Sequence, residues 1–344
     1  MEVICSIGPN VKSKEDLAVL AKAGMTSARF NFAHIKEENY AFIASLIKYL
    51  REEHPHIQVI QDIQGSKLRI SSKYSKEFLA TKGQEIYFCT ESYYSAHRAR
   101  ADEFCMIPIA CEGNKINFRD VTNIIMKDRT MEFNIINHGE DFQIIKAVVR
   151  RGGIIRAEKG VNAIGFDRSS LKLSLKDKKD INFGMENNVD SIYLSYVLSA
   201  DNLMELKGYL KQARIYYKNK QLPKLWAKIE SPEGVKNIKE ILKRCHGIVL
   251  ARGDLFAELD PLEVAYYERQ IIDCVKRTTK PLVIATYVLD SMRNSLLPSL
   301  AEINEIYRYI ETKIDGLMLV GEVSSGKYPK EAVEFLRNMI EKNG

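Results

Sequence analysis

Short apolar runs alternate with amphipathic helical patterns along most of this chain, and this alternation constrains its fold more than any other feature. Outside one interruption, eight runs have the continuous apolar character of strands buried on both faces of a parallel sheet. They are Val3–Ile7, Ala28–Phe32, Gln58–Ile63, Ser191–Leu194, Lys224–Ile229, Gly247–Leu250, Pro281–Ala285 and Gly316–Leu319. Eight strands separated by helices predict an α/β fold, a (β/α)8 TIM barrel.

Helical patterns fill the intervals between these strands. Ser13 and Asp16 have the spacing of a capping box at the start of the first helix. The longer amphipathic patterns that follow predict helices over Glu38–Glu52, Pro232–Arg244, Pro261–Thr278 and Pro329–Glu341.

The interruption runs from about residue 71 to 158, where no long amphipathic helix is expected. Short runs rich in Val, Ile, Tyr and Phe alternate there with turn residues, which is typical of a small all-β domain. The expected strands are Glu85–Cys89, Met106–Ile109, Lys115–Phe118, Asn123–Met126 and Phe142–Val149. We therefore predict a small β-barrel lid domain over 71–158, inserted into a barrel domain formed by 1–70 and 159–344.

Composition narrows the range of partners and compartments. The 344-residue chain has a formal net charge of +6, which is too weak and too dispersed to indicate nucleic-acid binding. Its apolar runs are far shorter than a membrane span, and the N-terminus lacks a signal-peptide pattern. The six cysteines are scattered without a CxxC pair, which favours buried thiols in a reducing compartment. We expect a cytoplasmic protein that binds neither nucleic acid nor a membrane.

Two of the apolar runs end in charged residues. Leu225–Glu230 ends with Lys228 and Glu230, which are two residues apart and so share one face of a strand. Gly247–Asp254 ends with Asp254. Functional groups of a parallel barrel lie where its strands end, and two carboxylates beside a lysine suit a hard divalent cation and an anionic substrate.

Nine short motifs, in order along nearly the whole chain, resemble those of the pyruvate kinase family. They are Cys5–Pro9, Ala28–His34, Asp62–Arg69, Lys159–Asn162, Lys228–Glu230, Ala251–Leu255, Ala285–Thr286, Gly321–Glu322 and Gly326–Pro329. The resemblance implies a glycolytic kinase that transfers a phosphoryl group from phosphoenolpyruvate to a nucleoside diphosphate, giving pyruvate and a nucleoside triphosphate.

The resemblance also implies roles for individual residues. Glu230 and Asp254 would hold Mg²⁺ or Mn²⁺, and Lys228 would stabilise the transferring phosphoryl group and the enolate. Thr286 would lie where the enolate is protonated, and Arg29 would act with Lys228 on the phosphoryl group.

Further positions match substrate- and nucleotide-binding residues of that family. Backbone N–H groups of Gly253 and Asp254 would bind the substrate carboxylate, with Thr286 and Ser195 beside the substrate. The expected phosphate-binding residues, with Asp62 in support, are Arg29, Asn31, Arg69 and Lys159.

Several positions depart from the potassium-dependent members of the family. Ala33, Ile63, Gln64, Lys67 and Ile70 together resemble a potassium-independent subgroup, in which a lysine ammonium takes the place of the monovalent cation. We therefore expect Lys67 to make K⁺ unnecessary. The C-terminal regulatory domain of the family is not expected in this chain, and a monomer or homodimer is expected rather than a tetramer.

Other interpretations stay open at this point. Glu230 and Asp254 are also compatible with a solvated pair, Lys67 with an exposed loop lysine and Thr286 with an ordinary strand residue. Tyr287 stands where glutamine is usual, which leaves open a specialised enzyme acting on another enol phosphate or 2-oxo acid. A non-catalytic interaction protein of the same fold is the third alternative.

Overall fold

A computed structural model describes residues 1–101, 103–111, 114–217 and 221–344. Contacts within the chain divide it into two compact units, and each contains a closed β-barrel. The barrel unit comprises residues 1–64, 177–253 and 265–344, and the inserted unit comprises residues 65–176 and 254–264. The inserted unit is therefore built from two separate stretches of the chain.

Eight parallel strands close the barrel of the barrel unit in the order β1-β17-β16-β15-β14-β13-β3-β2, which confirms the predicted fold class. They are β1 (Glu2–Ile7), β2 (Ser27–Asn31), β3 (Gln58–Ile63), β13 (Ser191–Leu194), β14 (Lys224–Ile229), β15 (Gly247–Ala251), β16 (Leu282–Ala285) and β17 (Gly316–Leu319). Strands β3, β13, β14 and β17 have the predicted bounds. Strands β1, β15 and β16 differ by one residue at one end, and β2 is shifted by one residue at both ends.

The inside of this barrel changes from apolar to polar along the strands. One buried cluster is formed by Ile4, Ile60, Tyr193, Trp226, Val249, Val283, Ala285 and Met318. Side chains two residues apart on a strand point to the same face. Ser6, Asp62, Ser195 and Lys228 follow members of this cluster by two residues, and all four are buried. A polar layer therefore lies at the carboxyl ends of the strands, directly beyond the apolar core.

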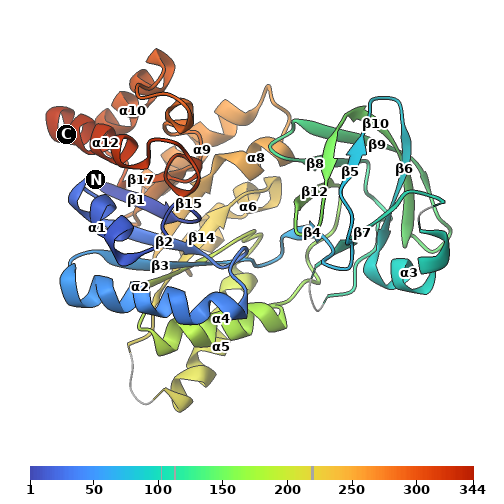
Figure 1. Ribbon diagram of the computed structural model, residues 1–344, viewed down its shortest axis with the longest axis horizontal. Helices are drawn as coiled ribbons and strands as arrows, with labels where there is room; N and C mark the ends of the chain where they lie inside the picture. The colour runs from blue at the N-terminus through green and yellow to red at the C-terminus, as the bar shows by residue number, and fades with distance from the viewer. Residues whose placement is uncertain (102, 112–113, 218–220) are drawn as a thin grey trace. The chain divides into compact units, whose positions relative to one another are not determined.

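Helices follow the strands as the sequence pattern predicts, and Figure 1 shows the first and last elements, β1, α1 and α12, side by side. Ser13 caps α1 in the predicted capping box with Asp16. Apart from one short helix of the inserted unit, the helices are α1 (Lys14–Lys22), α2 (Tyr40–Glu53), α4 (Leu175–Glu186), α5 (Ala200–Tyr216), α6 (Pro232–Lys236), α7 (Ile238–Leu242), α8 (Arg252–Glu258), α9 (Val264–Lys276), α10 (Leu300–Glu311), α11 (Gly321–Ser324) and α12 (Pro329–Asn343). Short 3₁₀ turns cover Glu37–Asn39 and Asp290–Arg293.

The single helix predicted over Pro232–Arg244 is wrong, because the segment is broken at Asn237 into α6 and α7. The side-chain amide of Asn237 donates to the carbonyl oxygen of Leu198 at 2.8 Å. The backbone of Asn237 has φ of −94° and ψ of 8°, outside the regular helical values, and the amphipathic pattern alone does not reveal such a tertiary contact.

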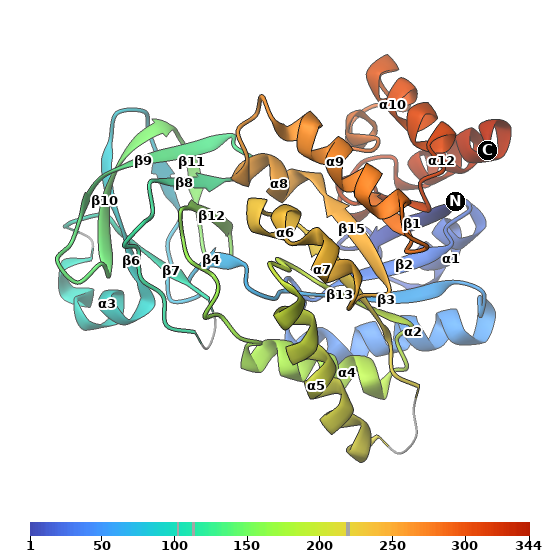
Figure 2. The same cartoon turned by 180° about the vertical axis from the view of Figure 1, so that it is seen from behind.

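Seven strands close the barrel of the inserted unit in the order β10-β6-β7-β4-β12-β8-β9, and β5 pairs with β11 separately. Figure 2 shows β8, β9 and β10 side by side. The strands are β4 (Leu68–Ile70), β5 (Phe78–Ala80), β6 (Glu85–Thr90), β7 (Met106–Ala110), β8 (Asn123–Met126), β9 (Met131–His138), β10 (Ile144–Arg151), β11 (Gly153–Ile155) and β12 (Gly160–Ile164), with a short helix α3 (Glu91–Ala96) and a 3₁₀ turn at Arg98–Arg100.

The strand predicted over Lys115–Phe118 is wrong, because that segment is irregular. Phe118 is fully buried in the core of the inserted unit, and its N–H donates to the carbonyl oxygen of Phe142 at 2.9 Å. Its apolar character therefore serves packing from a loop. The longest strands of the unit include β9, which the sequence analysis did not predict.

The second stretch of the inserted unit, residues 254–264, is fixed to the first by buried polar contacts. Glu258 forms an ion pair with Arg168 at 2.8 Å, with only 5% and 3% of the two side chains exposed. Asn162 donates to the same carboxylate at 3.0 Å. Arg129 donates to the carbonyl oxygens of Phe256 and Leu259 at 3.2 and 3.0 Å.

Within the described residues, no helix is both long and apolar enough to cross a bilayer. Cys5, Cys89, Cys111 and Cys245 are buried, in line with the prediction for most of the cysteines.

Candidate active site

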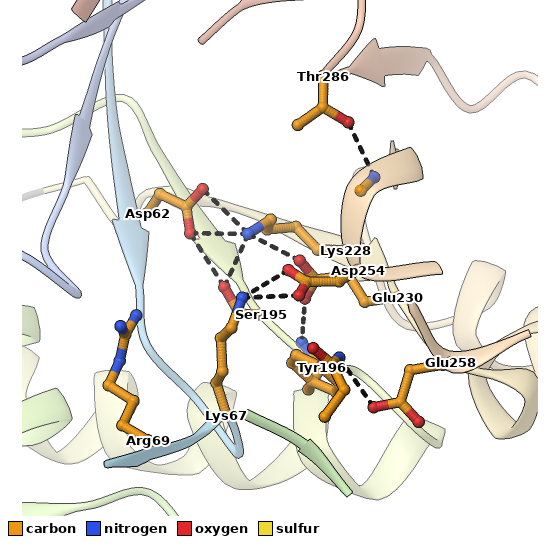
Figure 3. Close-up of polar contacts among 12 residues, drawn as sticks. Asp62, Lys67, Arg69, Ser195, Tyr196, Lys228, Glu230, Asp254, Glu258 and Thr286 are labelled. Atoms are coloured by element: carbon orange, nitrogen blue, oxygen red, sulfur yellow. Dashed lines mark hydrogen bonds and ion pairs between the residues drawn. The ribbon is translucent and has the colours of Figure 1, made fainter. Parts of the chain in front are cut away.

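Asp62, near the carboxyl end of β3, is the centre of the polar layer of the barrel unit (Figure 3). Its carboxylate accepts hydrogen bonds from Arg29 Nε at 2.9 Å and Nη2 at 2.7 Å, and from Ser195 Oγ at 3.1 Å. Lys228 Nζ lies 3.3 Å away. Burial alone would raise the pKa of Asp62, but Arg29 and Lys228 outweigh it and hold the pKa below its ordinary value. Asp62 is therefore a buried carboxylate that stays ionised.

Lys228, from β14, connects Asp62 to Glu230. Its ammonium group donates to Ser195 Oγ at 2.8 Å and lies 3.1 Å from a carboxylate oxygen of Glu230. Glu230 also accepts a hydrogen bond from the backbone N–H of Tyr196 at 2.6 Å. Figure 3 shows these side chains pointing toward one another from the ends of neighbouring strands. The structure therefore brings together the predicted residues Asp62, Ser195, Lys228 and Glu230.

Arg29, from β2, joins the same cluster on its other side. Besides Asp62, it donates from Nη1 to Ser6 Oγ at 2.6 Å, and its side chain is 7% exposed. Asn31, also predicted, lies two residues farther along and accepts the N–H of Ala33 at 3.2 Å. Asn31 thus shapes the loop after β2, while Arg29 supplies positive charge to the polar layer.

Thr286 directly follows β16 and has a left-handed backbone, with φ of +68°. Its hydroxyl oxygen accepts the backbone N–H of Gly253 at 2.9 Å, a contact drawn in Figure 3. The structure therefore pairs two predicted substrate-binding residues, and in this arrangement the N–H of Gly253 is directed at Thr286.

In the inserted unit, Lys67 forms an ion pair with Asp254. The ammonium nitrogen lies 2.7 Å from each carboxylate oxygen, and the two side chains are 20% and 18% exposed. The stem of Lys67 lies against Gly160, where an added Cβ would come 2.9 Å from Lys67 Cε. Lys67 is therefore a fixed charge beside a carboxylate, unlike a mobile surface lysine.

Arg69 and Lys159, the other predicted phosphate-binding residues of this unit, contact backbone carbonyls. Arg69 donates to the carbonyl oxygen of Glu158 at 2.7 Å, and Lys159 donates to that of Ile154. Burial lowers the pKa of Lys159, and the nearby charges of Lys127 and Arg156 lower it further. An anion bound beside Lys159 would favour its charged form.

The donor chemistry of Glu230 and Asp254 suits Mg²⁺, which takes oxygen ligands and is commonly held by one or two carboxylates together with water and substrate phosphate. No group of three or more His, Cys, Asp or Glu side chains arranged to hold a metal occurs in the described part of the chain. Glu230 belongs to the barrel unit and Asp254 to the inserted unit. These two carboxylates are the metal ligands that the sequence motifs predict.

Sequence reasoning missed three contributors to these contacts. Ser6 binds Arg29, the backbone N–H of Tyr196 binds Glu230, and Arg252 contacts the turn that carries Thr286. Ser6 had a usable signal, because it follows the inward-facing Ile4 by two residues on β1. A backbone donor such as Tyr196 has no such signal in the sequence.

Comparison with known proteins agrees with the earlier resemblance. Residues 1–333 match the family model described as pyruvate kinase, barrel domain. Similar curated proteins include pyruvate kinase 2 of Synechocystis, 30% identical over 99% of this chain, and a pyruvate kinase of Sporosarcina psychrophila, 31% identical over 97%. Plastidial pyruvate kinase 3 of Arabidopsis thaliana is 30% identical over 98%. The chain spans a little over half the length of these relatives, at 55–57%.

Proposed function

This chain belongs to the pyruvate kinase family, and on that premise we propose that it transfers a phosphoryl group between phosphoenolpyruvate and a nucleoside diphosphate. The products are pyruvate and a nucleoside triphosphate. The observation that carries the proposal is the buried cluster of Arg29, Asp62, Ser195, Lys228 and Glu230 at the carboxyl ends of the barrel strands. Phosphoryl transfer depends mainly on positioning and on positive charge around the transferring group. This cluster holds two positively charged side chains, those of Arg29 and Lys228, in fixed orientations.

Lys228 is the residue to which we assign stabilisation of the phosphoryl group and of the enolate. Its contacts with Ser195 and Glu230 fix the ammonium group in advance, and preorganised charge stabilises a transition state without further rearrangement. Arg29, oriented by Asp62 and Ser6, adds the second positive charge. Thr286 is assigned to the side of the enolate where the proton is added, and Ser195 and Gly253 to substrate binding.

The proposed binding of a divalent metal ion and a nucleotide rests on the same motifs. Glu230 and Asp254 are the proposed ligands of Mg²⁺ or Mn²⁺, which when bound would neutralise phosphoryl oxygens. Arg69, Lys159 and Asn31 are proposed to serve the nucleotide phosphates. The ion pair between Lys67 and Asp254 supports the proposal that a tethered ammonium replaces K⁺.

The direct test measures pyruvate formed from phosphoenolpyruvate and ADP by the purified protein with Mg²⁺, with another pyruvate kinase as the competent control. Lys228→Met should lower kcat about 100- to 1,000-fold, the usual loss when one preorganised electrostatic group is removed. Lys224→Met, at the exposed start of the same strand, should retain activity. Absence of pyruvate with the wild-type protein, or equal activity of the two variants, would contradict the proposal.

A second candidate is the same chemistry on another enol phosphate or 2-oxo acid, favoured by Tyr287. This residue directly follows Thr286, has a left-handed backbone and is 37% exposed. A screen of 2-oxo acids for solvent deuterium exchange at C3 separates the candidates. Faster exchange with a larger 2-oxo acid than with pyruvate would favour the second, whereas a protein that exchanges none would fit a non-catalytic role.

A further inference from the structure

The turn after β16 has an uncommon backbone conformation. Thr286 and Tyr287 are consecutive and have φ values of +68° and +55°. Positive φ is unfavourable for residues with a Cβ and is a marked outlier for a β-branched residue such as threonine. Such conformations persist only where the surrounding structure fixes them, and they gather at functional sites. Something in the barrel unit must therefore hold this turn.

Arg252, the first residue of α8, makes the contacts that hold it. Its Nε and Nη2 atoms donate to the carbonyl oxygen of Thr286 at 3.0 and 2.6 Å, and Nη2 also donates to the carbonyl oxygen of Tyr287 at 2.7 Å. One buried guanidinium thus binds both carbonyls of the strained pair. A lysine lacks this planar set of donors and cannot reproduce the contacts.

The charge of Arg252 is compensated from the outer helices of the barrel unit. Nη1 lies 2.8 Å from a carboxylate oxygen of Glu305 on α10 and donates to the hydroxyl of Tyr309 at 2.8 Å. Tyr309 in turn donates to Glu268 on α9 at 2.6 Å. A buried arginine needs such partners, and they fix the guanidinium between the helices and the turn.

The residue after Arg252 fixes the Thr286 side chain itself. The N–H of Gly253 donates to the Thr286 hydroxyl oxygen at 2.9 Å, and that hydroxyl donates to the carbonyl oxygen of Ala285. Arg252 and Gly253 therefore hold the backbone and the side chain of Thr286 together, which leaves the hydroxyl a single orientation.

We propose that Arg252 is a positioning residue that holds the Thr286–Tyr287 turn in its left-handed conformation and thereby fixes the Thr286 hydroxyl in place on the side of the enolate where the proton is added. This inference rests on the proposed function, which assigns the protonation step to Thr286. Arg252 contacts the turn and the outer helices, so its effect on the reaction passes through Thr286.

Arg252→Lys tests the proposal, with Arg269→Lys as the matched control because Arg269 lies on the exposed surface of α9. Three quantities are measured: kcat and KM for phosphoenolpyruvate, the C3 hydrogen exchange of pyruvate, and amide hydrogen exchange of the peptide covering residues 285–291. We expect Arg252→Lys to lower kcat and C3 exchange about 10- to 100-fold, in the range caused by small misplacements of reacting groups. KM should change less than about twofold, because the loss falls on the transition state.

Glycine provides a rescue that a general loss of stability would not show. Tyr287→Gly removes the steric cost of positive φ, so the turn depends less on Arg252. The loss of kcat caused by Arg252→Lys should then be at least about threefold smaller in a Tyr287→Gly background than in the wild type. If Arg252→Lys does not fold, Glu305→Gln replaces it, with a smaller loss expected in the same three quantities.

Wild-type kcat and C3 exchange in Arg252→Lys would overturn the proposal, as would a rise in KM alone or an equal loss in the glycine background. The peptide measurement separates the proposal from the proposed function. If the wild-type protein neither forms pyruvate nor exchanges C3 hydrogen, the proposed function fails. Faster amide hydrogen exchange of peptide 285–291 in Arg252→Lys, and not in Arg269→Lys, would still support the role of Arg252 in holding the turn. An unchanged exchange rate in Arg252→Lys would refute that role.

Discussion

Asp62 offers a sharp test of what holds the polar layer of the barrel together. Asp62 is 1% exposed, and its carboxylate accepts hydrogen bonds from Arg29 and Ser195 and forms an ion pair with Lys228. Asp62→Asn keeps the shape of the side chain but removes its charge. Arg29 then loses the ion pair recorded at 2.7 Å, and Lys228 keeps Glu230 as its remaining carboxylate.

The expected cost follows from burial. Removing one partner of a buried ion pair destabilises a protein by about 3–5 kcal/mol, because an uncompensated charge stays buried. That is a large part of a typical free energy of unfolding, which is about 5–15 kcal/mol. Because this free energy falls linearly with urea concentration, the loss should lower the urea midpoint of unfolding by about 1–2 M. Asp273→Asn removes an ion pair with Arg269 whose side chains are 45% and 68% exposed, and should cost less than about 1 kcal/mol.

The contribution of Asp62 to the stability of the protein should change with pH in a definite direction. Because the pKa of Asp62 is lower in the folded protein than its ordinary value, its contribution to stability is complete above the unfolded pKa of about 3.9. It is lost as the pH falls through the lower folded pKa. The difference between the wild type and Asp62→Asn should therefore be largest at neutral pH and shrink below about pH 4.

Trp226 provides the assay, because it is the only tryptophan of the chain and lies in the barrel core two residues before Lys228. Urea titrations followed by its fluorescence at several pH values report unfolding of the barrel unit. Equal midpoints for the wild type and Asp62→Asn at pH 7 would refute the reasoning, and so would a deficit that does not change with pH.

Two further predictions concern the inserted unit. Lys67→Met should lower kcat about tenfold or more, because Asp254 loses its tethered counter-charge. Added K⁺ should restore part of the rate of this variant and leave the rate of the wild type unchanged. A many-fold acceleration of the wild type by K⁺ would contradict this prediction. Glu258→Gln should destabilise the inserted unit by about 3–5 kcal/mol, since its ion pair with Arg168 is buried. The matched control Glu103→Gln, at an exposed ion pair of the same unit, should change stability by less than about 0.5 kcal/mol. Amide hydrogen exchange across residues 65–176 measures both variants, and equal protection in the two would count against the assigned burial.

The barrel was predictable because its strands are buried on both faces and are separated by helices, so that each apolar run has one interpretation. The strands of the inserted unit were harder to predict from the sequence. Strands β4, β5 and β11 are only three residues long, and the run at Lys115–Phe118 buries Phe118 from a loop. At the break, Asn237 contacts Leu198, and only the folded chain reveals this contact.

The candidate site shows the same division. Lys228 was predicted because it lies near the charged end of an apolar run, whereas Asp62 was predicted only from the resemblance of its motif. Arg252 lies in a recognised motif, but its role depends on the φ values of Thr286 and Tyr287, which are set by packing. Backbone conformation and backbone donors leave no pattern of residue types to detect.

The contacts of Glu258 and Arg129 limit how this architecture can be divided or recombined. A fragment of residues 65–176 alone would retain Arg168 but lack the carboxylate that neutralises it, and Arg129 would lose two carbonyl acceptors. Grafting the inserted barrel onto another scaffold would therefore require the eleven residues from 254 to 264 to move with it. Although this barrel enters the chain as an insertion after β3, its physical boundary includes a segment that follows β15, so the two stretches must change together.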